Sequence, residues 1–244
     1  MSLRVTLATA ARVLGQLRRD HRTVALVLLV PALLLTLFRY VFDGQPETFD
    51  RVGAPMVGIF PLVSMFLVTS IAMLRERTSG TLERLMSLPL AKLDLLLGYG
   101  LAFGLMAALQ ALVTVTVATT VYDLDVAGSV WLVGLIAVAD ALLGVALGLL
   151  ASAFARSEFQ AVQFMPAVIL PQILLCGLLV PRDLMAPVLD WVSYVLPMTY
   201  AYDALARATS GDAGPELALD VAVVIGSIVV ALALGAATLR RRTP

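Results

Sequence analysis

The sequence predicts an all-α integral membrane protein: six transmembrane helices, an N-terminal interfacial amphipathic helix and an outer re-entrant helical hairpin between spans 5 and 6. Of the 244 residues, 60% are hydrophobic and only 14% are charged, and the mean hydropathy is +0.95. This composition lies far outside the range of soluble proteins. The apolar residues form continuous runs without the alternation of a membrane strand, so the spans are predicted to be helices.

Six apolar runs are each close to the roughly 20 residues that a helix needs to cross a bilayer. The third run is longer than this, so we expect that helix to tilt or to project from the membrane. The whole chain, 1–244, is predicted to be a single transmembrane domain. Its spans are placed at residues 24–42, 54–74, 95–121, 130–153, 161–180 and 217–238.

Residues 1–22 precede the first span and are predicted to form an amphipathic helix at the membrane surface. Such a helix lies flat, with arginines near anionic head groups. The segment is not expected to be a signal peptide, because no short apolar core with a small-residue cleavage site follows the charged stretch. The apolar stripe of this helix consists of Leu3, Leu7, Ala10, Leu14 and Leu17.

Lysine and arginine residues are concentrated on one side of the predicted spans. Of the 17 in the chain, 13 fall before span 1, between spans 2 and 3, after span 4 or after span 6. Positive residues collect on the cytoplasmic side of membrane proteins. Both termini are therefore predicted to lie in the cytoplasm, and the protein in the cell membrane.

A densely charged segment, residues 75–92, separates the second and third spans. Its charges cannot lie in hydrocarbon, so we expect it in water at the cytoplasmic surface. A short helix can start after Gly80, with Thr81 as its cap and Leu82 and Leu85 on one face, and end before Pro89. Such a helix is suited to docking a soluble partner; an ordinary solvated loop is the alternative.

Two stretches of the chain resemble, in the right order, segments of the ABC-2 type permeases, the membrane subunits of ATP-driven exporters. The first resembles the loop before the third span of that family and comprises Glu76, Arg77, Gly80, Thr81, Leu82, Glu83, Arg84, Leu85, Pro89, Leu90, Asp94, Leu97 and Gly98. The second resembles the outer segment before the last span and comprises Gly177, Val180, Pro181, Met185, Ala186, Pro187, Leu196, Pro197, Met198, Thr199, Tyr200, Ala201, Ala204 and Leu205. The resemblance covers essentially the whole chain.

The resemblance implies a set of partners and a docking site. An ATPase subunit, which would hold ATP and Mg²⁺, would dock on the charged segment and border the N-terminal helix. This chain would bind no cofactor itself. A second permease subunit, identical or not, membrane lipids and an amphipathic substrate are the other expected partners. The implied ATPase-docking residues are Glu76, Arg77, Gly80, Thr81, Leu82, Glu83, Arg84 and Leu85.

Residues 181–214 are too many for a simple loop and too interrupted by prolines to span. Trp191 and the tyrosines nearby suit the membrane–water boundary. We expect two short helices that dip back into the outer leaflet, and the resemblance implies that they close the outer side of the translocation path. A lid on the surface with no gating role is the alternative. The expected outer-gate residues are Pro181, Trp191, Pro197 and Tyr200.

Polar and small residues inside the spans have two interpretations. Asp140 lies near the middle of span 4, where an ionised carboxylate is costly. It is either a cation or protonation site, or a structural group that is neutral or bonded to Gln110 or Thr116 of span 3. Gly144 and Gly148, four residues apart, allow close approach of another helix, within or between subunits.

No enzyme chemistry is visible in the sequence. A Gly-x-x-x-x-Gly-Lys phosphate loop does not occur, and the single histidine and single cysteine cannot build a His/Cys metal site. A basic surface with interleaved aromatic residues, as nucleic acid requires, is also missing. Together with this absence, the resemblance implies a transport subunit that uses energy from a partner, and the apolar spans favour a drug-like compound or a lipid as the substrate.

Three other functions stay open. A polysaccharide or glycolipid export permease of the same family would need more aromatic residues along its path than the 7% present. A proton-coupled secondary transporter would use Asp140, and its halves should be related. An intramembrane enzyme would need a paired nucleophile and base or a set of metal ligands.

Overall fold

The computed structural model describes residues 2–80 and 92–238, in which every regular element is a helix. In chain order these elements are α1 (Leu3–Arg19), α2 (His21–Val41), α3 (Pro46–Thr78), α5 (Lys92–Thr120), α6 (Val130–Ser152), α7 (Glu158–Leu175), the 3₁₀ turn η1 (Arg182–Leu184), α8 (Pro187–Ser193), α9 (Pro197–Ser210) and α10 (Pro215–Thr238). Within this part of the chain, six helices are long and apolar enough to cross a membrane, namely α2, α3, α5, α6, α7 and α10. The predicted helical class is confirmed, and the six predicted spans correspond to these six candidate membrane-spanning helices.

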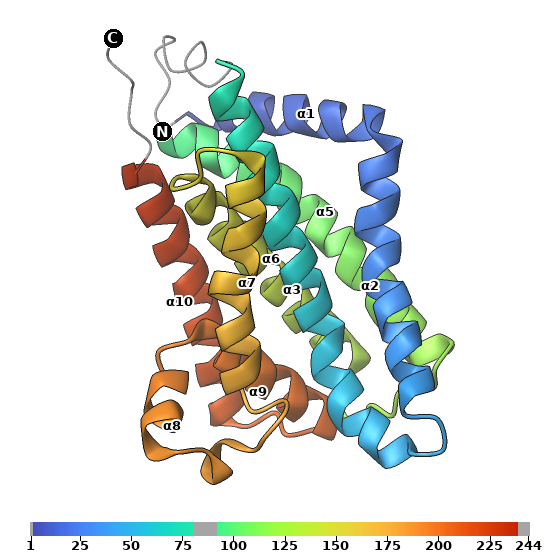
Figure 1. The fold of residues 1–244 in the computed structure, drawn as a ribbon. Coiled ribbons are helices and arrows are strands. Elements are labelled where there is room, and N and C mark those ends of the chain that lie inside the picture. The colour runs from blue at the N-terminus through green and yellow to red at the C-terminus, as the bar shows by residue number, and fades with distance from the viewer. Residues whose placement is uncertain (1, 81–91, 239–244) are drawn as a thin grey trace.

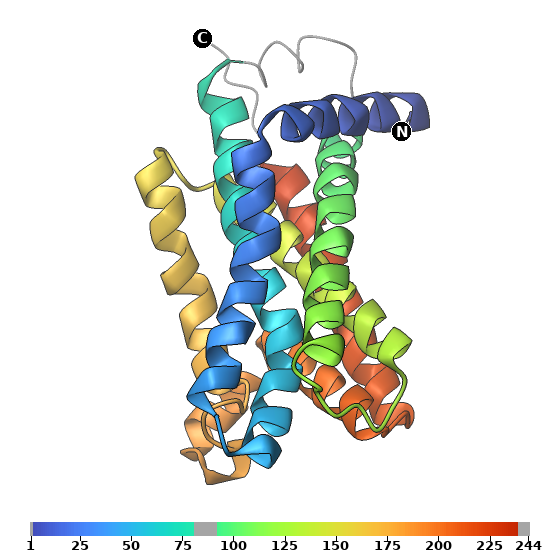
Figure 2. The same ribbon diagram turned by 90° about the vertical axis from the view of Figure 1, so that its right-hand side faces the viewer.

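The six long helices stand side by side, and the shorter elements lie at the two ends of the bundle (Figure 1). Helix α1 lies across one end, which we call the inner end, and the view turned by 90° shows the same arrangement (Figure 2). The α8 and α9 helices lie at the opposite end, which we call the outer end. The names follow the predicted orientation in the membrane.

Two helix boundaries differ from the predicted spans. Helix α3 has 33 residues, whereas the apolar run predicted only 54–74, because hydropathy marks the part in the bilayer and not the charged turns beyond it. Helix α7 ends at Leu175, five residues before the predicted end at 180. Gly177 follows with φ +100°, a left-handed conformation that favours glycine after the end of a helix.

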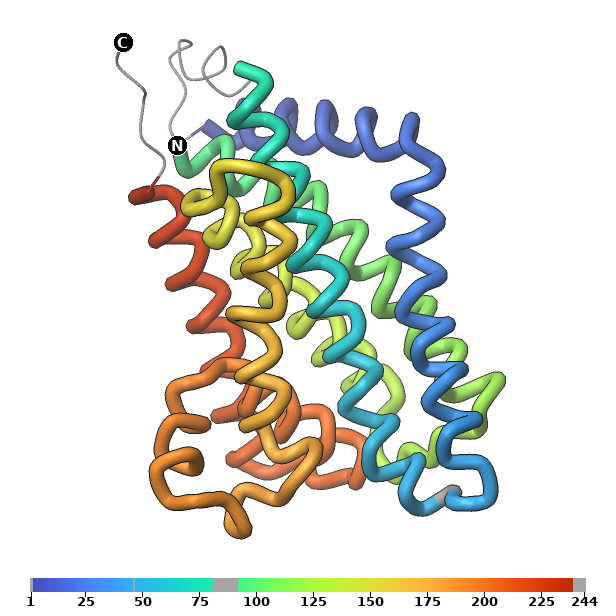
Figure 3. The backbone as a smooth tube through the Cα atoms, in the orientation of Figure 1, coloured from blue at the N-terminus to red at the C-terminus, as the bar shows by residue number. Residues whose placement is uncertain are grey.

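The core of the bundle is the contact between α3 and α6, which run in the same direction, with α3 through the middle of the tube trace (Figure 3). A Cβ atom at Gly144 would overlap the backbone of Leu62, and one at Gly148 would overlap the backbone of Phe66. The side chains of Leu62 and Phe66 are fully buried. The small residues of α6 therefore form a packing contact within the chain, one of the two predicted alternatives.

Helix α1 packs on the first turns of α5. Its Thr9 lies so close to Gly98 that a Cβ there would overlap the threonine side chain, and Ala10 and Val13 are buried in the same contact. Leu3, from the predicted apolar stripe, is instead 75% exposed. Part of the stripe thus covers α5, while the location of α1 at a membrane surface stays a prediction.

Candidate functional site

The predicted docking segment begins inside a helix and not in a loop. Helix α3 continues to Thr78, so Glu76 and Arg77 lie in its last turn. Gly80 follows in a left-handed conformation with φ +75°. The other predicted docking residues, Thr81, Leu82, Glu83, Arg84 and Leu85, lie outside the described residues.

Glu76 faces α1. Nη1 of Arg12 donates to Oε1 of Glu76 at 3.0 Å, and Nε2 of Gln16 donates to the same oxygen at 3.3 Å. The guanidinium group of Arg12 also donates to the hydroxyl of Tyr99 on α5. These four residues, which we call the inner polar cluster, join α1, α3 and α5. Charge-assisted bonds of this kind are stronger than neutral ones.

The arginines beside Glu76 join α3 to two further helices. Arg75 makes a bidentate contact with Glu158 at the start of α7, with N–O distances of 2.7 and 3.1 Å. Arg77 donates to the backbone carbonyl of Ser152 in the last turn of α6, where carbonyl groups lack helical partners. The last turn of α3 thus contacts α1, α6 and α7. Sequence reasoning assigned Glu76 and Arg77 to a partner protein and missed these internal contacts.

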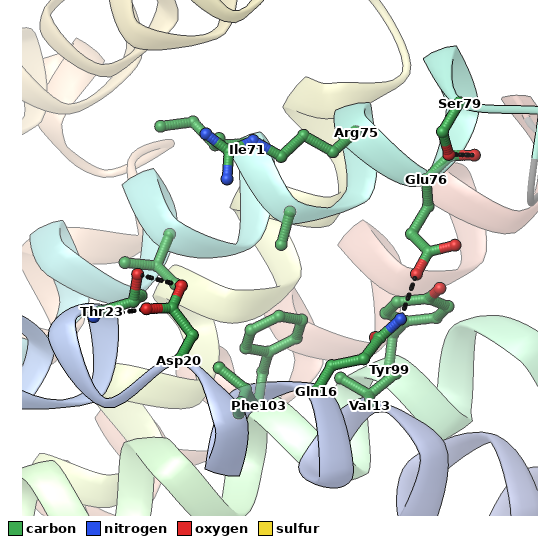
Figure 4. Close-up of a pocket in the computed structure, with 13 residues that line it drawn as sticks. Val13, Gln16, Asp20, Thr23, Ile71, Arg75, Glu76, Ser79, Tyr99 and Phe103 are labelled. Carbon is green, nitrogen blue, oxygen red and sulfur yellow. Dashed lines mark hydrogen bonds between the residues drawn. The ribbon is translucent and has the colours of Figure 1, made fainter.

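A cavity of about 530 Å³ opens at the inner end between α1, α2, α3 and α5. The close-up shows carboxylate side chains at its sides and aromatic and aliphatic side chains between them (Figure 4). It was not predicted, because it depends on α1 turning across the end of the bundle. Its lining comprises Val13, Gln16, Leu17, Asp20, Thr23, Val68, Ile71, Ala72, Arg75, Glu76, Ser79, Tyr99 and Phe103.

The predicted outer-gate residues lie in one hairpin formed by η1, α8 and α9. Pro181 directly precedes η1, and Pro197 begins α9, where the missing N–H of proline costs no helical bond. The hydroxyl of Tyr200 donates to the carbonyl of Tyr194 at 2.9 Å, which ties α9 to the end of α8. Trp191 is 77% exposed on α8. Whether the hairpin re-enters the membrane stays a prediction.

The two helices of the hairpin have different surroundings. Helix α9 is buried against α3, α6 and α10 through Met198, Ala201, Ala204, Leu205 and Ala208. The η1–α8 part presents apolar side chains to its surroundings at Leu184, Val188, Trp191 and Val195. An exposed apolar surface of this size is typical of contact with lipid or with another protein.

Charged residues also hold the outer end together. Nη2 of Arg182 contacts Oδ2 of Asp203 at 2.6 Å, and both side chains are largely buried. Arg207 contacts Asp212 and Asp220, each at 3.2 Å. Burial raises the pKa of the Asp203 carboxyl above its usual range, although Arg182 acts in the opposite direction. We call these five residues the outer polar cluster.

Asp140 is buried, with 1% of its surface exposed. Within the described part of the chain, neither of its carboxylate oxygens has a hydrogen-bond partner. Of the predicted alternatives, a bond from Asp140 to Gln110 or Thr116 is therefore wrong, while the neutral structural group and the cation or protonation site stay predictions. The amide of Gln110 instead donates to the carbonyl of Val27 at 2.8 Å, on the side of α5 that faces α2.

The surroundings of Asp140 show why this carboxylate fits there. A Cβ atom at Gly58 of α3 would overlap Asp140 and also Leu205 of α9. Gly58 thus leaves room for the carboxylate where three helices, α3, α6 and α9, meet. Sequence reasoning missed Gly58, because no pattern along the chain indicated which helix faces Asp140. Among residues 2–80 and 92–238, no group of three or more His, Cys, Asp or Glu side chains could hold a metal ion.

Comparison with known proteins matches the sequence of this chain to a family of transporters. The family model described as ABC-2 type transporter matches residues 4–208. Over 206 residues, the chain is 28% identical to the probable multidrug ABC transporter permease YbhS of Escherichia coli strain K12; the match covers 84% of this chain and 55% of that protein.

Two further relatives are similar over shorter stretches. The probable multidrug ABC transporter permease YbhR of the same strain is 26% identical over 162 residues, 66% of this chain and 44% of that protein. ABC transporter G family member 20 of Dictyostelium discoideum is 27% identical over 164 residues, 66% of this chain and 22% of that protein. The matches thus span about half or less of the length of these relatives.

Proposed function

Because this chain belongs to the ABC-2 type transporter family, we propose that it is the permease subunit of an exporter driven by separate ATPase subunits. The family match, which runs from α1 to α9, is the observation that carries this proposal. The chain is a multi-pass membrane protein with six candidate spans among its described residues. ATP and Mg²⁺ are held by the partner ATPase, and both termini lie in the cytoplasm.

The ATPase docks at the inner end, on the segment from Glu76 to Leu85. The contacts of the last turn of α3 support this location, because that turn is joined to α1 through Glu76 and to α6 through Arg77. A push on the segment after Gly80 therefore acts on several helices at once. Glu76 and Arg77 transmit the push, and the residues after Gly80 make the contact with the partner.

Two permease subunits pair around a central path and move an amphipathic substrate, a drug-like compound or a lipid. The apolar character of the spans and the multidrug relatives support this substrate class. Export of a polysaccharide or glycolipid by the same architecture is the alternative within the family. The low aromatic content, 7% of the chain, argues against it.

The outer hairpin, residues 181–214, gates substrate release and re-enters the outer leaflet. The exposed apolar side chains of Val188 and Val192 on α8 support contact with lipid. A cysteine scan from Asp183 to Ala208 in a Cys176→Ala background tests this with an impermeant thiol reagent. Protection at Val188 and Val192, with labelling near Arg182 and Gly211, is expected. Uniform labelling of the stretch would mean a solvated loop.

The variant Leu85→Asp tests the function through docking. A charge buried in the contact with the ATPase is expected to weaken it by about 3 kcal/mol, more than a hundredfold. The measurements are the amount of ATPase that copurifies with the permease and substrate-stimulated ATP hydrolysis. Leu85→Met, which stays apolar, is the matched control and should retain both. Unchanged copurification and hydrolysis in Leu85→Asp would remove the docking proposal.

A second candidate, a proton-coupled secondary transporter, rests on the buried carboxylate of Asp140, which has no hydrogen-bond partner among the described residues. Asp140→Asn separates the two functions, because the amide keeps the shape of the side chain but cannot ionise. The exporter is expected to keep near-normal transport in this variant. Loss of transport with intact membrane expression would favour the secondary transporter.

A further inference from the structure

The cavity at the inner end has the size and place of a ligand site. Its volume of about 530 Å³ lies within the range of about 300–1,000 Å³ that small-molecule sites occupy. It is lined by residues of α1, α2, α3 and α5, among them Arg75 and Glu76 of the last turn of α3. The function proposed above assigns no role to it.

One part of the cavity wall is apolar and aromatic. Val68, Ile71 and Ala72 of α3 face it, together with Phe103 of α5 and Leu17 of α1. The rings of Tyr99 and Phe103 are stacked with their centroids 6.5 Å apart. Aromatic rings attract cations at their faces. The face of Tyr99 is already used by Arg12, whose Cζ lies 5.6 Å from the ring centroid. An apolar ligand that carries a positive charge could use the apolar side chains and the ring of Phe103.

The other part of the wall carries carboxylates from two helices. Oε2 of Glu76 is buried and lacks a hydrogen-bond partner within residues 2–80 and 92–238. Asp20 lies across the cavity from it, beside Phe103 (Figure 4). Its oxygens accept bonds from the backbone N–H and the hydroxyl of Thr23, at 3.1 and 2.6 Å. These bonds lower the pKa of Asp20, so it is ionised at neutral pH.

The charges around the cavity leave one negative charge in surplus. Arg12 is paired with Glu76, and Arg75 with Glu158, which leaves Asp20 as the third carboxylate. Arg75 also acts on Asp20 electrostatically, but its guanidinium group is bound in the bidentate contact with Glu158. The exposed arginines of the nearby turn, Arg18, Arg19 and Arg22, do not line the cavity.

We propose that this cavity binds a monovalent lipophilic cation, with its charge between Asp20 and Glu76 and its apolar groups on Ile71 and Phe103. With α1 at the membrane surface, as predicted, such a cation reaches the site from the inner leaflet. If the exporter function proposed above holds, the cavity is where the substrate first binds and its charge is selected. A lipophilic anion of the same shape is rejected, because it would meet the carboxylates.

Binding of radiolabelled tetraphenylphosphonium to the purified chain in phosphatidylcholine nanodiscs tests the proposal. Tetraphenylborate has nearly the same shape and the opposite charge, and empty nanodiscs give the partition into lipid. We expect saturable binding of one tetraphenylphosphonium per chain and no saturable binding of tetraphenylborate. Equal binding of the two ions, or no binding above empty nanodiscs, would overturn the proposal.

Variants locate the site. Asp20→Asn and Glu76→Gln should each weaken tetraphenylphosphonium binding by about tenfold, since each removes one charge near the cation. Both are expected to fold, because asparagine also caps helices well and glutamine can still accept from Arg12. Ile71→Trp, which fills the cavity without changing its charge, should abolish binding. Asp212→Asn, at the outer end, is the matched control and should bind normally.

Unchanged binding in Asp20→Asn, Glu76→Gln and Ile71→Trp would place the cation elsewhere and overturn the assignment. Thermal unfolding of each variant confirms that its fold is intact. The experiment uses the permease without the ATPase, so its failure would leave the docking result with Leu85→Asp untouched. A failure of docking with normal cation binding would in turn remove the exporter and keep the site.

Discussion

The inner polar cluster and the outer polar cluster are held by contacts of different reach along the chain. At the inner end, Arg12 contacts Glu76 and Tyr99, which are 64 and 87 residues away. At the outer end, Arg182 contacts Asp203, only 21 residues away. The inner polar cluster therefore fixes distant helices to one another, whereas the outer polar cluster folds one stretch of chain on itself. This difference suits an inner end that transmits motion and an outer hairpin that moves as a unit.

Apolar contacts, in contrast to the outer polar cluster, do join the outer hairpin to distant helices. Leu205 of the hairpin reaches Gly58 of α3 beside Asp140 of α6. The hairpin is thus attached to the core of the bundle through α9, while α8 stays exposed. Variants in each region should show which contacts hold the fold and which couple the two ends.

The largest effect is expected from Gly58→Leu. The new side chain would overlap Asp140 and Leu205 and separate α9 from α3 and α6. We expect a loss of about 3 kcal/mol in the free energy of unfolding. Gly134→Leu is the control, because no atom lies within 4 Å of a Cβ atom built there. Thermal unfolding in detergent measures both, and equal stability of the two variants would contradict the contact.

Arg182→Met is expected to cost about 2 kcal/mol, because it leaves the largely buried carboxylate of Asp203 without its partner. The structural change that this substitution causes should be confined to the hairpin. Fluorescence of Trp191 in a Trp131→Phe background reports it, since the chain has only two tryptophans. A loss of ATPase docking in Arg182→Met would show that the outer cluster is not local.

The loss in Arg182→Met should depend on pH. The pKa of Asp203 is raised by burial, and without Arg182 it should rise further. A carboxyl with a raised folded-state pKa stabilises the fold below its unfolded pKa, and this contribution is lost as the pH rises through the folded value. The variant should therefore lose less stability at acidic pH than at neutral pH. Melting curves across this range that run parallel to those of the wild type would contradict the assignment.

Glu76→Ala removes the acceptor at the centre of the inner polar cluster and is expected to cost about 1.5 kcal/mol. The side chain of Arg12 is 31% exposed and can be hydrated, so this cost is smaller than that of Arg182→Met. The effect on ATPase stimulation should be larger than on stability, because α1 and α3 lose their link. Glu76→Gln, which can still accept from Arg12, should keep the stimulation at saturating substrate concentration; its loss there would contradict a positioning role.

The smallest effect is expected at Arg75 and Glu158. Their side chains are 63% and 54% exposed, and exposed pairs contribute about 0.2–1 kcal/mol. A double-mutant cycle with Arg75→Ala and Glu158→Ala should give a coupling of about 0.5 kcal/mol. Coupling well above 1 kcal/mol would mean that the contact is shielded in the assembled transporter.

The spans could be predicted from the sequence because each is a local apolar run, but their ends depend on other features. Hydropathy predicts a loop for the charged turn with Arg75, Glu76 and Arg77. This turn is helical in the structure because α1, α6 and α7 supply partners for its charges. Gly177 indicates the end of α7 in the sequence, but the apolar residues around it led to a longer predicted span.

The sites were less predictable than the spans, because they depend on contacts between distant helices. Asp140 and Gln110 were recognised as polar residues in spans, but which way each side chain faces follows from the packing of α5 and α6. The gate residues Pro181 and Pro197 begin short helical elements, as proline chemistry suggests. No local sequence pattern predicts the inner cavity, because four helices supply its walls.

The proposed function requires the two ends of the molecule to face opposite sides of the membrane. Single cysteines at Arg18 and Asp212, both exposed positions, in a Cys176→Ala background allow this to be measured in intact cells with an impermeant thiol reagent. We predict that Asp212→Cys is labelled at once and that Arg18→Cys is labelled only after the membrane is permeabilised. Labelling of Arg18→Cys in intact cells, with Asp212→Cys protected, would contradict this orientation.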